Sequence, residues 1–227
     1  MNAQQTEYLV VPGKPTKEMP RLTRAGYVLV NPADLLAARI DGEFREVDIV
    51  IGAMIIGPYN GLVKVVYDAP QLKTLTPKIL LVDGGLDLTD KFGEFGDEAV
   101  AIDRFILGRP LKEGEVDNPE LSLWPTLMRD LSCPEFRLAK LWAAYQNLMF
   151  NVAYFSGEGT SLGGYNLKEA MGVYLPEDRN DRAIGRILRI ESCGKGSSAR
   201  VVNLDDASGC LVMKKAEPAN RHCPESL

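Results

Sequence analysis

The pattern of apolar and polar positions places strands near both ends of the chain and helices in its middle. Two β-branched runs at 46–56 and 62–67, separated by a segment rich in glycine and proline, predict a β-hairpin. Shorter apolar runs at 8–11, 26–30 and 78–82 predict single strands. Near the C-terminus, three apolar runs joined by glycine-containing turns predict a three-stranded β-meander, with strands at 184–191, 200–204 and 210–215.

Helix start and stop residues lie between these strands. Asn31 followed by Pro32 is typical of a helix N-terminus, so we expect a short helix over 32–40. A second helix is expected over 98–107, because an acidic capping residue precedes it and a glycine follows it. We therefore expect a central helical segment over about 97–155.

The strongest helical pattern covers residues 133–155. Its few polar residues lie mostly on one stripe, and nearly every other position is apolar. Such a helix is either a central core helix or one whose apolar face meets another protein chain. Aromatic residues and methionine are enriched in interface cores, so the second interpretation predicts an interface formed by Phe136, Trp142, Tyr145, Met149, Phe150 and Tyr154.

Strands first, helices next and strands last indicate an α+β fold with a mixed or antiparallel sheet. Prolines interrupt the first residues, so we expect an extended N-terminal arm over 1–24. One α+β domain is expected over 25–215, with a possible subdivision near residue 158. The polar residues 216–227 are expected to form a C-terminal tail.

Composition restricts the class of protein. The chain has 227 residues, 45% of them apolar and 25% charged, as in an average globular protein that buries its own core. The net charge of −5 argues against a general nucleic-acid coat. No apolar run is long enough to cross a bilayer and no secretion signal is evident, so we expect no membrane partner. A cytoplasmic or intracellular location follows, including the inside of a viral particle.

Candidate chemistry is sparse in this sequence. The single histidine, His222, lies five residues before the C-terminus, far from any catalytic motif. Four scattered cysteines lack the spacing of a zinc or redox site, so no cofactor is expected. The first hypothesis is therefore a non-enzymatic structural or assembly subunit, such as a virion, phage or scaffold component. Its partners would be protein subunits, either copies of itself or other chains.

A second hypothesis is a nucleic-acid-binding subunit that uses the stretch from Arg179 to Arg200. Arg179, Arg182, Arg186 and Arg189 follow one another at spacings that place them on one face of a helix. Interleaved acidic residues favour local salt bridges instead, and the apolar run after Gly185 favours a strand, which would scatter the guanidinium groups.

A third hypothesis is a Mg²⁺-dependent enzyme acting on phosphates. Asp83, Asp87 and Asp90 follow the strand expected at 78–82 and could supply oxygen ligands to the metal. The competing interpretation is ordinary turn chemistry, because Asp-Gly-Gly is a common turn sequence.

Overall fold

The computed structural model describes residues 7–67, 69–95, 99–128, 135–150, 169–176 and 181–216, with the side chains of the fourth range described from Lys140 onward. Within these residues the strands are β1 (Tyr8–Pro12), β2 (Tyr27–Leu29), β3 (Ile49–Tyr59), β4 (Leu62–Tyr67), β5 (Leu86–Asp87), β6 (Ala99–Ala101), β7 (Leu111–Lys112), β8 (Glu169–Ala170), β9 (Val173–Tyr174), β10 (Ile184–Ile190), β11 (Ala199–Val202) and β12 (Cys210–Lys215). The helices are α1 (Pro15–Arg24), α2 (Pro32–Ile40), α3 (Pro70–Lys73), α4 (Glu113–Val116), α5 (Trp124–Leu127) and α6 (Glu135–Phe150), with 3₁₀ turns η1 (Thr89–Glu94) and η3 (Cys193–Lys195).

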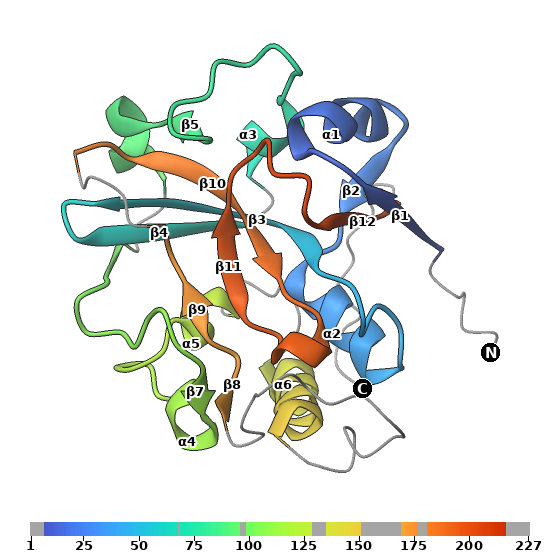
Figure 1. Ribbon diagram of the computed structural model, residues 1–227, viewed down its shortest axis with the longest axis vertical. Coiled ribbons are helices and arrows are strands. Elements are labelled where there is room, and N and C mark those ends of the chain that lie inside the picture. The colour runs from blue at the N-terminus through green and yellow to red at the C-terminus, as the bar shows by residue number, and fades with distance from the viewer. Residues whose placement is uncertain are drawn as a thin grey trace.

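One mixed sheet of ten described strands forms the frame of the molecule (Figure 1). Its main order is β1-β12-β3-β10-β11-β9, and β2, β4, β5 and β6 extend it at the sides. The pairs β12–β3 and β11–β9 are parallel, and the other pairs in this sheet are antiparallel. β7 and β8 form a separate small ladder. This mixed sheet with helices confirms the predicted α+β class.

The central strand β3 is buried on both faces, because its alternate residues enter two hydrophobic clusters. The first cluster receives Ile49, Ile51, Ala53 and Ile55, and the second receives Val50, Met54 and Ile56. Helices α2, α4, α5 and α6 lie on one side of the sheet, and α1 and α3 lie on the other (Figure 1). The sheet is therefore a shared layer between two cores.

Helix α2 has the predicted bounds of 32–40, and its N-terminal cap explains why. The Asn31 Oδ1 atom accepts a hydrogen bond of 2.8 Å from the backbone N–H of Asp34. The Asp34 carboxylate accepts in return from the backbone N–H of Asn31. Pro32 occupies the first helical position, where no backbone donor is needed.

The predicted hairpin is confirmed, since β3 and β4 pair antiparallel around the turn at 60–61. The three C-terminal strands also form close to their predicted positions, but they do not form a meander. β12 pairs with β3, β1 and β2, whereas β11 pairs with β10 and β9. Leu211, Val212 and Met213 of β12 are fully buried. Because β12 is buried on both faces, it fits best in the interior of the sheet and not at the end of a meander.

Three segments differ from the sequence prediction. In the segment expected to be a helix over 98–107, the described residues 99–107 do not form one, because β6 pairs with β4 and buries Val100 in the first cluster. Residues 78–82 do not form a strand: Leu80 is 85% exposed, and Val82 makes only an isolated bridge to Gly85. The apolar run at 78–82 therefore lies on the surface with only part of its side chains covered.

The third difference concerns residues 15–24, which form helix α1 where an extended arm was expected. Pro15 lies at the first helical position and costs no hydrogen bond there. Pro20 lies inside the helix, but Met19 and Leu22 beside it are buried in the second cluster. Burial of this face stabilises a helix that the prolines alone disfavour.

The predicted helix over 133–155 is confirmed as α6 within the described range, and residues 151–155 lie outside it. Residue 158 and the tail over 217–227 also lie outside the described residues. None of the helices in the described part of the chain combines the length and apolar character that crossing a membrane requires.

Candidate functional site

A cavity of about 550 Å³ opens among α2, α5, α6 and the α4 segment, on the side of the sheet that carries the first cluster. Its apolar lining consists of Leu36, Pro125, Met128, Leu141, Trp142 and Ala143. Its polar lining consists of Glu113, Asp117, Gln146 and Asn147. The cavity is thus apolar in most of its wall and acidic at the α4 side.

One carboxylate oxygen organises the polar side of the cavity. The indole Nε1 of Trp142 donates a 2.6 Å hydrogen bond to Oδ1 of Asp117. The amide Nε2 of Gln146 donates to the same oxygen at 2.7 Å. Trp142 and Gln146 are one helical turn apart on α6, so both donors reach Asp117, the residue that directly follows α4. This arrangement fixes the wall of α6 against α4.

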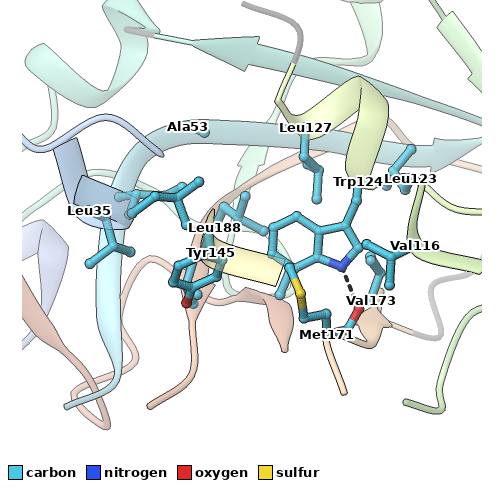
Figure 2. Close-up of a cluster of buried hydrophobic side chains, with 14 of the residues drawn as sticks. Leu35, Ala53, Val116, Leu123, Trp124, Leu127, Tyr145, Met171, Val173 and Leu188 are labelled. Atoms are coloured by element: carbon cyan, nitrogen blue, oxygen red, sulfur yellow. Dashed lines mark hydrogen bonds between the residues drawn. The ribbon is translucent and has the colours of Figure 1, made fainter. Parts of the chain in front are cut away.

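The wall of the cavity also rests on the hydrophobic core. The ring of Trp142 lies against the ring of Trp124, with centroids 5.7 Å apart and planes inclined by 37°. Trp124 is buried among side chains such as Leu123, Leu127 and Val116, and its indole N–H donates to the backbone carbonyl of Met171 (Figure 2). Trp142 is therefore a partly exposed side chain held by a rigid neighbour.

A buried arginine ties α2 to α6 beneath this wall. Arg39 donates hydrogen bonds to the phenol oxygen of Tyr145 at 3.0 Å, to Oγ of Ser197 at 2.7 Å and to the backbone carbonyl of Val47 at 2.9 Å. Burial raises the pKa of Tyr145, and this outweighs the nearby positive charge of Arg39. Burial likewise raises the pKa of the neighbouring Cys193 thiol. The phenol and thiol are therefore neutral, and Arg39 holds its helix through neutral partners.

The structure separates the predicted interface residues. Tyr145, Met149 and Phe150 lie in the first hydrophobic cluster and are at most 8% exposed, so this chain itself covers nearly all of the surface that they could offer a partner. The apolar face of α6 that they form packs toward α2 and the sheet, which explains this correction. Trp142 alone among the described members lines an open cavity. The side chain of Phe136 and all of Tyr154 lie outside the described residues.

The arginine stripe of the nucleic-acid hypothesis does not form, because Ile184–Ile190 is strand β10, as the apolar run after Gly185 indicated. Arg186 is paired with Ile55 in the ladder and Arg189 with Val50, and these two partners belong to the two different clusters. The side chains of Arg186 and Arg189 therefore lie on opposite faces of the sheet.

Both of these arginines are also engaged. Arg186 is buried and donates to Oδ1 of Asn203 at 3.1 Å and to the carbonyl of Asp83 at 2.7 Å. Arg189 forms an ion pair with Asp206 at 3.4 Å. Arg182 is more exposed and lies 3.7 Å from the carboxylate of Asp87, while Arg179 is outside the described residues.

The three aspartates of the metal hypothesis are not brought together. Asp83 and Gly84 both have positive φ, at 48° and 76°, and form the turn between Val82 and Gly85. The Asp87 carboxylate accepts from the backbone and the hydroxyl of Thr89, and these hydrogen bonds lower its pKa. Asp90 lies in η1. Within the described ranges, no three acidic, cysteine or histidine side chains are grouped so that they could hold a metal ion.

Glu113 and Asp117 were not among the site residues predicted from the sequence. They lie four residues apart in an acidic segment, a spacing that places two side chains on the same face of a helical turn. The spacing of these two residues can be read from the sequence. The cavity beside them cannot, because it forms only when α6 and α2 pack against α4 and α5.

Comparisons with known proteins agree with the fold. No protein-family model matches the sequence, and the comparison with curated proteins gave no match. A solved structure described as "Accommodation of massive sequence variation in Nanoarchaeota by the C-type lectin fold" is similar, with a TM-score of 0.61 and 13% sequence identity. The match covers 94% of this chain and 99% of the other. At this identity the likeness concerns the fold alone.

Proposed function

We propose that this chain is a non-enzymatic assembly subunit that binds a protein partner at the cavity face, the surface around Trp142, Asp117 and Gln146. The setting would be a scaffold or a virion component, inside a cell or a viral particle. The observation that carries the proposal is the position of Trp142. It is a large aromatic side chain, partly exposed, next to a concave surface and fixed by Asp117 and Trp124.

Such a residue suits the centre of a protein interface for two physical reasons. Tryptophan contributes a large contact area and is enriched among the residues that dominate binding energy. A side chain that is already fixed loses little conformational entropy when the partner binds. Trp142 meets both conditions, because its ring is packed and its N–H is hydrogen-bonded before any partner arrives.

The fold neighbour offers further support. It is described as a C-type lectin fold that accommodates massive sequence variation. A fold that tolerates such variation has a frame that does not depend on every surface residue. In this chain the sheet and its two clusters would be that frame, and the cavity face would be the part that binds.

Two adjacent alanines on α6 allow a matched test. Ala143 lines the cavity, whereas Ala144 is exposed and does not line it. Ala143→Arg should fill the cavity face and disrupt binding, and Ala144→Arg adds the same side chain to the same helix outside it. The first partner to test is a second copy of the chain, by size-exclusion chromatography with light scattering.

The proposal expects a discrete multimer for the wild type and for Ala144→Arg, and a monomer for Ala143→Arg. A monomeric wild type, or a multimer that Ala143→Arg leaves intact, would contradict assembly through this face. Absorbance at 260 and 280 nm in the same run checks the alternative of a nucleic-acid complex.

A further inference from the structure

We infer that the cavity beside Trp142 receives an arginine side chain from the protein partner. This inference rests on the proposed function, because it states which chemical group of the partner enters the cavity face.

The hydrogen-bonding inventory of the cavity is the first argument. Its two fixed N–H donors, from Trp142 and Gln146, are both used by Oδ1 of Asp117. Three acceptors then remain: Oδ2 of Asp117, Oε1 of Gln146 and the carboxylate of Glu113. In the part of the chain that the structure describes, no donor bonds to any of these three. The polar wall thus offers three acceptor groups to a ligand, and both of its charged side chains are negative.

Gln146 places a neutral acceptor beside the carboxylates. It is 8% exposed, it lines the cavity, and its amide Nε2 already donates to Asp117. A donor that enters the cavity can therefore reach Oε1 of Gln146 together with the second oxygen of Asp117.

Charge is the second argument. Glu113 and Asp117 both line the cavity, and neither forms an ion pair with a described residue. A ligand that is both cationic and rich in donors matches two carboxylates and an amide oxygen. A guanidinium group carries five N–H donors in a plane and remains charged at any ordinary pH.

Shape and apolar lining are the third argument. A volume of about 550 Å³ lies within the range of about 300–1,000 Å³ that is usual for ligand cavities. Leu36, Met128 and Leu141 can cover the methylene groups of a long side chain. The indole of Trp142 also offers an aromatic surface at the site, on which a guanidinium packs better than an ammonium group.

Two tripeptides provide the test: acetyl-Gly-Arg-Gly-amide and acetyl-Gly-citrulline-Gly-amide, which has nearly the same shape without the charge. Binding is followed by calorimetry and by the indole N–H signals in NMR spectra, of which the chain has two because it has two tryptophans. Trp142→Phe assigns them. The arginine peptide should bind about tenfold more tightly than the citrulline peptide and shift the Trp142 signal, which corresponds to a difference of about 1.4 kcal/mol.

Charge variants complete the design. Asp117→Asn combined with Glu113→Gln should abolish the preference for arginine over citrulline. Glu120→Gln is the matched control, because Glu120 is an exposed carboxylate of the same region outside the cavity lining. Equal binding of both peptides, no binding of either at millimolar concentration, or an unchanged preference in the double variant would overturn the inference.

These results are separable from those of the proposed function. A multimer that Ala143→Arg disrupts, in a protein that does not bind the arginine peptide, retains assembly and rejects the arginine site. A monomeric wild type that binds the arginine peptide through Asp117 and Glu113 retains the site and rejects self-assembly.

Discussion

Single polar side chains join separate segments at the edge of the core by hydrogen bonds, and Asp48 is an example. It lies just before β3, and its Oδ1 accepts a 2.9 Å hydrogen bond from the backbone N–H of Ser192. Its Oδ2 accepts from Nζ of Lys195 at 2.9 Å. Burial by itself would raise the pKa of Asp48, but these two hydrogen bonds, together with the positive charges of Lys195 and Arg189, outweigh it and lower the pKa. The carboxylate is therefore stabilised in its ionised form in the folded protein.

This lowered pKa predicts acid sensitivity at Asp48. A carboxyl group whose pKa is lower in the folded state stabilises the fold above its unfolded pKa of about 3.9, and this contribution is lost as the pH falls through the folded pKa. Urea unfolding at a series of pH values from about 6 to 3 should show a steeper loss of stability for the wild type than for Asp48→Asn. Equal slopes in the two proteins would show that Asp48 is not linked to folding.

At the residue scale, the sequence named Trp142 as one of six interface candidates but could not separate it from its neighbours on the helix. Tyr145, Met149 and Phe150 have the same apolar character, and only the packing of α6 against α2 and the sheet assigns them to the core. Cavity residues from separate segments come together through long-range contacts. The apolar pattern of one helix contains no information about those contacts.

Elements with local determinants were predicted well. The bounds of α2 follow from its cap and first-turn proline, and the β3–β4 hairpin follows from two β-branched runs around a short turn. The segment at 98–107 carried similar local helix signals, yet Ala99–Ala101 became strand β6. Its pairing with β4 is a long-range interaction, and it overrode the local preference.

The cap of α2 gives a prediction at this scale. Asn31→Ala removes the acceptor for the Asp34 N–H and should lower the free energy of unfolding by about 0.5–2 kcal/mol, as measured by urea denaturation. Asn31→Asp is the control, because aspartate caps helices as well as asparagine does. A loss of the same size in Asn31→Asp would indicate that the cap hydrogen bond is not the cause.

For the molecule as a whole, the first and last strands of the chain pair with each other inside one sheet. The C-terminal strand β12 pairs with β3 on one side and with the N-terminal strand β1 on the other. The sequence could locate these strands but not their order, because an apolar run specifies burial and not its neighbours. The expected meander failed for that reason, whereas the α+β class required only the succession of elements.

This arrangement predicts that the two hydrophobic clusters unfold together. Ile51 and Met54 lie on the same strand, are fully buried and belong to opposite clusters. Ile51→Ala and Met54→Ala should each lower stability by about 2–5 kcal/mol. Because one backbone supports both clusters, each variant should shift the unfolding midpoint equally by tryptophan fluorescence and by far-ultraviolet circular dichroism.

The two probes separate the alternatives because both tryptophans belong to one side of the sheet. Trp124 is in the first cluster and Trp142 packs against it, so fluorescence reports that side, whereas circular dichroism reports the whole backbone. If the second cluster unfolded independently, Met54→Ala would lower the circular dichroism midpoint and leave the fluorescence midpoint unchanged. Coincident transitions in both variants would mean that the cavity face is only as stable as the side of the sheet that lies opposite to it.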